Sequence, residues 1–224
     1  MRHSITMVLM ATVLRQRVAE AGAQLDLLVL ASEPNGSIGV DLASGAFVRA
    51  RHPATAGRVL RPFSVASGQL APGDMFDAAQ PELAELAGPL RPSARLHPRK
   101  AERWLRPLLH PPRPPLLGLT GNAIPYWTLE GDRPSVALVE PEQVGVARAP
   151  GGYVCRFMWE HTFHELFLRD RRLLAALEAR RVQSCGERQV RNLLGYSPDR
   201  LLVALTAPIQ GYCYKAVMGA LPRR

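Results

Sequence analysis

The chain has 224 residues, of which 47% are apolar and 21% are charged, and its 28 Lys and Arg against 19 Asp and Glu give a net charge of +9. This composition excludes the charge-rich, apolar-poor class of disordered chains, and the length suits one large domain or two small ones. The positive charge favours a polyanionic partner, although an arginine-rich composition with only two lysines, Lys100 and Lys215, is also typical of a GC-rich genome.

The first expected element is a helix near the N-terminus. Apolar residues recur at helical spacing from Ile5 to Val18, and Gly22 suits its end. We expect residues 1–23 to form a peripheral helical extension. Its apolar stretch is shorter than the roughly 20 residues that span a bilayer, and no small-residue cleavage site follows it. The segment therefore predicts neither a membrane span nor a signal peptide.

Short strands follow at intervals of roughly ten residues. Residues 25–31 form an apolar run that ends in the turn-forming residues 32–36, and residues 36–51 continue as strand, turn and strand. The same rhythm extends over residues 58–79 and is typical of a sandwich or barrel. It breaks at Pro81, after which residues 82–88 are compatible with a helical turn.

The middle of the chain is basic and rich in proline. Residues 98–109 predict a short basic helix, and the prolines of residues 110–115 predict a stiff extended connector, because proline neither continues a helix nor fits inside a sheet. From Arg91 to Arg113 there are seven basic residues against one acidic residue, Glu102. Two interpretations stay open: a surface that follows phosphates, or a disordered insertion.

The C-terminal part of the chain returns to strands. The Pro-Gly-Gly sequence at residues 150–152 marks the expected domain boundary, and residues 153–168 predict a hairpin beyond it. Asp170 is placed to cap an amphipathic helix over residues 171–181. Further strand-like segments occupy residues 135–140, 143–148, 200–206 and 212–220.

These elements predict a mainly β protein with a few helices, of the β-rich α+β class. We expect three parts: the helical extension of residues 1–23, a first small barrel over residues 24–149 with a basic proline-rich insertion at about 91–115, and a second small barrel over residues 150–224. The cysteines Cys155, Cys185 and Cys213 are too widely spaced for a CxxC motif and odd in number. They predict a reduced protein of the cytoplasm.

Five blocks of sequence resemble, in order, the bacterial family of dual OB-fold domain proteins. The blocks are LVLASEPNG, GAFVRARHP, GDMFDAAQPE, YVCRFMWEHTFHELFLRD and RLLVALTAPIQGYCYKAVMGAL. The resemblance runs from about Leu25 to Leu221, but residues 91–115 and the N-terminal extension have no counterpart in the family. It implies two OB-like barrels, a role in nucleic-acid binding and an association with bacterial conflict or antiviral defence, and it implies no catalytic residues.

An OB barrel binds single strands through a basic face and through aromatic rings on which bases stack, at about 1–3 kcal/mol per base. In the first barrel, Arg49 and Arg51 are at strand spacing and share a face with Phe47. In the second, Tyr212 and Tyr214 share a face. The residues that we expect to contact nucleic acid are Arg49, Arg51, Arg58, Arg61, Arg99, Lys100, Arg103, Arg156, Trp159, Tyr212, Tyr214 and Lys215.

Each of these residues also has an ordinary structural interpretation. Aromatic rings most often fill barrel cores, and arginines are often no more than a solvated surface. The one pattern that approaches a metal site joins His161, His164 and Glu165, but a zincin helix needs histidines four residues apart with Glu beside the first. On strands, the two histidines would face opposite sides. We therefore expect no metal and no cofactor.

The first hypothesis is a non-catalytic nucleic-acid-binding protein. The second is an adaptor that docks protein partners, such as products of the same operon, through the apolar faces of residues 5–18 and 171–177. The third is an enzyme with a pocket between the barrels, for which His161, His164 and Cys155 are the residues to test. The choice between DNA and RNA, the strandedness of the ligand and the oligomeric state stay open.

Overall fold

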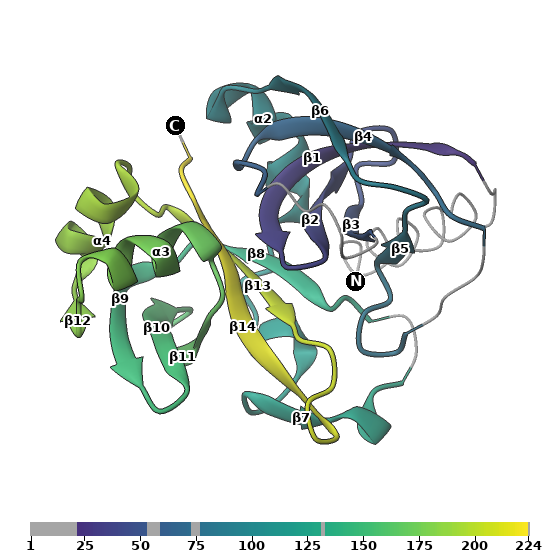
Figure 1. Ribbon diagram of the computed structural model, residues 1–224. Coiled ribbons are helices and arrows are strands. Elements are labelled where there is room, and N and C mark those ends of the chain that lie inside the picture. The colour runs from purple at the N-terminus through teal and green to yellow at the C-terminus, as the bar shows by residue number, and fades with distance from the viewer. Residues whose placement is uncertain (1–21, 53–58, 73–76, 131–132, 224) are drawn as a thin grey trace.

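Figure 1 shows the computed structural model of the protein, which describes residues 22–52, 59–72, 77–130 and 133–223. Two sheets lie side by side and carry a few short helices, so the expected mainly β class is confirmed. The helical extension expected over residues 1–23 falls almost entirely outside the described residues. Arg58 also lies outside them. None of the described helices is long and apolar enough to cross a membrane.

The first sheet has six strands in the order β5-β3-β2-β1-β4-β6. They are β1 (Gln24–Glu33), β2 (Gly36–Asp41), β3 (Phe47–Arg51), β4 (Ser64–Gln69), β5 (Leu83–Glu85) and β6 (Arg91–Arg95). β1, β2 and β3 form an antiparallel meander, and β5 pairs in parallel with β3 where a helical turn was expected. A bridge between Leu70 and Leu86 joins the ends of β4 and β5, although these strands stand on opposite sides of β1.

The second sheet has eight strands, in the order β12-β9-β10-β11-β14-β13-β8 with β7 paired to β14. They are β7 (Ala123–Pro125), β8 (Val136–Val139), β9 (Glu142–Ala149), β10 (Gly152–Trp159), β11 (Thr162–Leu168), β12 (Ser184–Cys185), β13 (Arg200–Leu205) and β14 (Tyr212–Leu221). The expected hairpin is confirmed as β10 and β11, which meet at Glu160 and His161, both with positive φ, as a tight turn between twisted strands requires.

The described helices are short. They are α2 (Pro98–Leu105), α3 (Arg171–Ala179) and α4 (Glu187–Leu194), with single 3-10 turns η1 (Arg106–Leu108), η2 (Leu116–Gly118) and η3 (Tyr126–Thr128). The basic segment is thus ordered as β6, α2 and η1, so the expectation of a disordered insertion is wrong. In Figure 1, α2 lies above the first sheet, and α3 and α4 lie along the outer side of the second.

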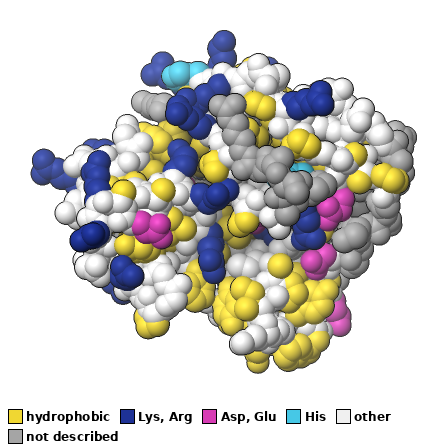
Figure 2. Space-filling model, in the orientation of Figure 1, with side chains coloured by type: hydrophobic (Ala, Val, Ile, Leu, Met, Phe, Trp, Pro, Cys, Tyr) yellow, Lys and Arg dark blue, Asp and Glu magenta, His cyan; other side chains and the backbone are white. Residues whose placement is uncertain are grey.

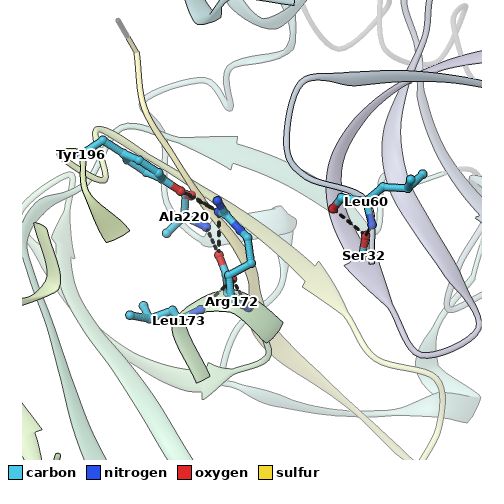
Figure 3. A network of polar contacts seen from close by, with 7 residues as sticks. Ser32, Leu60, Arg172, Leu173, Tyr196 and Ala220 are labelled. Carbon is cyan, nitrogen blue, oxygen red and sulfur yellow. Dashed lines mark hydrogen bonds and ion pairs between the residues drawn. The ribbon is translucent and has the colours of Figure 1, made fainter. Parts of the chain in front are cut away.

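A polar network ties the start of α3 to the last strand. Asp170 caps the helix as expected, accepting hydrogen bonds from the backbone N–H groups of Arg172 and Leu173 at 2.9 and 3.1 Å. Its other carboxylate oxygen accepts from the backbone N–H of Ala220 at 2.8 Å. Figure 3 shows Arg172 donating to the Ala220 carbonyl, at 3.1 Å, and to the Tyr196 hydroxyl, at 2.6 Å. Arg172 is therefore a structural residue.

Buried side chains form three clusters, one within each sheet and one between the sheets. β1 shows the reason for this arrangement, because its side chains alternate between two clusters. Leu27 and Val29 belong to the cluster of the first sheet, whereas Leu28 and Leu30 belong to the cluster between the sheets. A strand that is buried on both faces needs apolar residues at every position, which accounts for the continuous apolar run. Residues of the second sheet in the shared cluster include Leu138, Leu202, Ala216 and Met218.

The division between the sheets falls earlier in the chain than residues 149 and 150. β8 and β9, which the sequence placed in the first barrel, pair within the second sheet. In the sequence, the part of the basic segment after β6 and the proline cluster therefore lie between the last strand of the first sheet, β6, and the first strand of the second, β7. A buried carboxylate also joins the sheets, because Glu82, just before β5, accepts a hydrogen bond from the backbone N–H of Ser135, just before β8, at 2.7 Å.

Candidate nucleic-acid interface

Exposed basic side chains gather on β6, α2 and the turn that follows α2. All six arginines and lysines of this stretch are exposed, and we call them the basic surface. They are Arg91, Arg95, Arg99, Lys100, Arg103 and Arg106. Figure 2 shows Lys and Arg side chains at the top of the molecule, where Figure 1 places α2 and β6, and further ones down the left side and the middle of the same face.

Local sequence explains why these side chains face solvent. α2 is amphipathic, with Ala101 and Leu105 buried in the cluster between the sheets and the basic residues on the opposite side. β6 is an edge strand that pairs with β4 alone, and all five of its residues are exposed. Arginines and a proline, Pro92, are typical of strand edges that do not pair further.

The one acidic residue of the segment, Glu102, is neutralised by the buried Arg200. Both carboxylate oxygens of Glu102 accept hydrogen bonds from the guanidinium group of Arg200, at 2.7 and 2.8 Å. Arg200 is 1% exposed and also bonds Glu140, at 3.2 Å. The hydrogen bond from Arg200 holds the pKa of Glu102 below its ordinary value. The cations of the basic surface therefore have no free carboxylate within their own segment.

The basic surface also carries one aromatic ring. The guanidinium group of Arg103 lies 3.7 Å from the centroid of the Trp104 ring, and Trp104 is partly exposed. A cation stacked on an indole presents a flat face of the kind that bases stack on. Sequence reasoning counted the seven basic residues from Arg91 to Arg113 and considered them as a surface that follows phosphates, but it named only Arg99, Lys100 and Arg103 as contact residues. It did not consider Trp104 as a contact.

The structure places three of the expected contact residues in the interior, so their assignment to an open face is wrong. Arg49 is 2% exposed, Trp159 is 3% exposed and Lys215 is 3% exposed. The face of β3 that holds Phe47 and Arg49 packs against the second sheet, and Arg49 donates a hydrogen bond to the carbonyl of Leu205 at 2.9 Å. The expected binding face of the first sheet is therefore an interface between the sheets.

The remaining expected residues are dispersed. Arg51 pairs with Glu85 at 3.3 Å and Arg156 with Glu165 at 2.6 Å, each on a neighbouring strand, and Arg61 is exposed. Tyr212 is 39% exposed and Tyr214 is half-buried; both lie at the β7 end of β14, far from α2 in Figure 1. The structure therefore brings together only Arg99, Lys100 and Arg103 of the expected set.

Lys215 points into the second sheet. Its ammonium group donates to the carbonyl of Leu119 at 2.6 Å, and no carboxylate of the described residues pairs with it. Burial lowers the pKa of Lys215 to about 8. The His164 ring stacks on Phe157 with the centroids 5.1 Å apart, and its buried Nε2 atom has no hydrogen-bond partner among the residues that the structure describes. Burial lowers the pKa of His164 as well. The interior at this point favours neutral side chains.

We expect Lys215→Met to stabilise the protein at pH 7 by about 1–2 kcal/mol. A pKa lowered from 10.5 to about 8 means that the buried charge costs about 3 kcal/mol, of which the lost bond to the Leu119 carbonyl offsets roughly half. Between pH 8 and 10.5, Lys215 holds its proton in the unfolded chain but has lost it in the folded chain, so the stability of the unmodified protein rises with pH. The difference in stability between Lys215→Met and the unmodified protein therefore shrinks over this range. Urea unfolding from pH 7 to 10.5 measures this, and a destabilised variant would contradict it.

The residues of the enzyme hypothesis are not brought together. His161 is exposed at the turn between β10 and β11, whereas Cys155 is 1% exposed and burial raises its pKa to about 12. A thiol of this kind is a weak nucleophile at neutral pH. In the part of the chain that the structure describes, no group of three or more His, Cys, Asp and Glu side chains is placed to hold a metal ion.

Comparison of the chain with models of protein families, with curated proteins and with solved structures finds no match. The function must therefore be inferred from the charge and geometry described above.

Proposed function

We propose that the protein binds nucleic acid through the basic surface and does so without catalysis. The observation that carries the proposal is six exposed cations on β6, α2 and η1 whose one acidic neighbour in sequence, Glu102, is bound to the buried Arg200. The setting implied by the family resemblance, bacterial conflict or antiviral defence, belongs to this proposal. So does the reducing cytoplasm, since the three cysteines are buried and free.

The spacing of the cations suits a phosphate backbone. Arg99, Lys100, Arg103 and Arg106 extend over about 10 Å, given a rise of about 1.5 Å per helical residue. One strand of a duplex carries a phosphate for about every 3.4 Å of axis, so the helix spans about three phosphates. Each phosphate that is neutralised releases counterions, and binding through this surface should therefore weaken steeply with salt.

We also propose that the two sheets are OB-like barrels. In the first sheet, the Leu70–Leu86 bridge and a backbone hydrogen bond from Ala71 to Glu85, at 2.9 Å, support closure between β4 and β5. In the second, β8 stands at one end of the strand order and β9 is second from the other end, beside the two-residue β12, yet only Glu140 and Pro141 separate β8 from β9 in the chain. A single bent strand formed by β8 and β9 would close that sheet.

The test of nucleic-acid binding is a triple variant, Arg99→Gln, Lys100→Gln and Arg103→Gln. Its affinity for a fluorescent single-stranded oligonucleotide, measured by anisotropy at 50–200 mM salt, should fall at least about tenfold at the lowest salt. The slope of log affinity against log salt should fall by about 2, because each lost phosphate contact removes about 0.7.

The matched control changes three other exposed arginines, Arg171, Arg180 and Arg188, to Gln. It removes the same net charge from the α3 and α4 side of the molecule and should leave affinity within about twofold. Equal losses in both variants would show a general charge effect, and an unchanged affinity in the first would refute the assignment.

A second candidate function, the protein-interaction adaptor, is favoured by an exposed apolar patch beside β7. Trp127 is 67% exposed and contacts Tyr212 edge-on at 5.7 Å, and Ile209 is 48% exposed. Docking through residues 171–177 is not compatible with the structure, because the apolar side chains Leu173 and Leu177 are buried in the protein's own core. Residues 5–18 lie outside the described part of the chain. A protein complex insensitive to salt would favour this candidate.

A further inference from the structure

A cleft of about 860 Å³ opens where the basic surface ends. Arg106 belongs to both the basic surface and the cleft wall. Its lining includes the proline cluster of residues 111–115 together with Arg133 and Trp159. Sites for small molecules generally measure about 300–1,000 Å³, so the cleft is large enough to hold one.

The wall of the cleft is cationic. Three arginines, Arg106, Arg113 and Arg133, line it together with two carboxylates. Glu140 is already paired with Arg200 and with Arg223, at 3.2 and 3.5 Å. This leaves Glu160 as the one lining carboxylate without an ion pair among the described residues. An anion that enters the cleft therefore meets an excess of positive charge.

Arg133 is the least satisfied of the three arginines. Its Nε and Nη1 atoms are buried and have no hydrogen-bond partner in the described part of the chain, and its Nη2 atom lies 3.5 Å from the carbonyl of Ala78. Burial is the main reason that its pKa is lowered. Buried donors left unbonded are costly, and a phosphate oxygen is an acceptor that a guanidinium group binds strongly.

Flat apolar groups line the same cleft. The ring of His110 packs edge-on against Trp159, with the centroids 5.0 Å apart. His110 is held neutral, because its Nε2 accepts a hydrogen bond from the Leu117 N–H at 3.2 Å and its Nδ1 therefore donates to the Pro111 carbonyl at 2.8 Å. Burial lowers the pKa of His110, which also favours the neutral ring. Aromatic rings and prolines provide a surface for a planar ring.

We propose that the cleft binds one phosphorylated nucleotide, with the phosphate at Arg113 and Arg133 and the base against the prolines and the ring of His110. The nucleotide is either free or the phosphorylated end of a bound strand. The second source rests on the proposed function, since a strand lying along α2 reaches the cleft through Arg106. The basic surface would then hold internal phosphates, and the cleft would hold the end.

The experiment uses one oligonucleotide in four forms: with a 5′-phosphate, with a 3′-phosphate, with hydroxyl ends, and circular. The intact protein should bind one phosphorylated form about tenfold more tightly than the hydroxyl form, and the circle should bind like the hydroxyl form. Arg113→Gln should abolish the preference and leave affinity for the hydroxyl form unchanged. Arg113 is exposed, so this variant should fold; a thermal melt confirms that it does.

A parallel titration with adenosine monophosphate, followed by tryptophan fluorescence, distinguishes the free nucleotide from the strand end. Saturable binding that Arg113→Gln abolishes, without any preference for phosphorylated ends, assigns the cleft to free nucleotides. The triple variant of the basic surface should weaken binding of the hydroxyl form and of the circle. If it does not, the proposed function fails, and this result is distinguishable from a failure of the cleft to bind a phosphorylated nucleotide. The inference is overturned if neither phosphorylated end nor adenosine monophosphate binds in a manner that depends on Arg113.

Discussion

Leu202→Ala should lower the free energy of unfolding of the whole molecule by about 2–5 kcal/mol. Leu202 lies on β13 in the second sheet, is 0% exposed and belongs to the cluster that packs between the sheets. Removal of its side chain leaves a cavity lined by residues of both sheets. Since each sheet uses this cluster as part of its core, we expect both to unfold in one cooperative transition.

The comparison variant is Leu28→Ala, which alters the same cluster from β1 in the first sheet. Both variants should shift a single transition that is observed alike by tryptophan fluorescence and by far-ultraviolet circular dichroism in urea. Two transitions, with each variant moving only one of them, would show instead that the sheets are independent folding units.

Glu102→Ala should destabilise the protein by about 3 kcal/mol or more, because it leaves Arg200 buried with only part of its hydrogen bonding. The Arg200 side chain is 1% exposed and makes its two shortest hydrogen bonds to Glu102. The Glu102 side chain is itself 30% exposed, so the cost lies with Arg200. Because the Arg200 charge stays desolvated when Glu102 is lost, loss of Glu102 alone should cost more than loss of both side chains. The double variant with Arg200→Met should therefore recover a large part of the stability.

The pH dependence gives this prediction a second measurement. The pKa of Glu102 is lowered in the folded state, so its contribution is complete above the ordinary pKa of 4.5 and is lost as the pH falls through the lower, folded value. The unmodified protein should lose more stability than Glu102→Ala between pH 5 and 3, as measured by urea unfolding. A cost below about 1 kcal/mol at pH 7, or parallel pH profiles, would contradict the assigned role.

Local sequence signals predicted the elements that depend on neighbours in the chain. The hairpin of β10 and β11, the Asp170 cap and the helix of the basic segment all follow from turn residues, capping chemistry and spacing over a few positions. The part of the site that was predicted, Arg99, Lys100 and Arg103, has the same origin, since one helix places basic residues on a common face.

The failures have a common physical cause in long-range packing. Period-two alternation correctly placed Phe47 and Arg49 on one face of β3, but it contains no information about whether that face meets water or another sheet. Likewise, Lys215 was correctly separated from Tyr212 and Tyr214, yet its side of β14 is the interior of the second sheet. The charge of a side chain was a poor guide to its exposure at these two positions.

The sequence by itself determined the mainly β class, most of the strands and helices, and the presence of a segment with seven positive charges, because these follow from composition and short-range periodicity. Only the tertiary structure decided which faces of the strands are covered, that β8 and β9 join the second sheet, and that Glu102 is paired with Arg200, 98 positions away. Such pairings depend on how whole surfaces fit together when apolar area is buried, and this property belongs to the folded chain rather than to any stretch of residues.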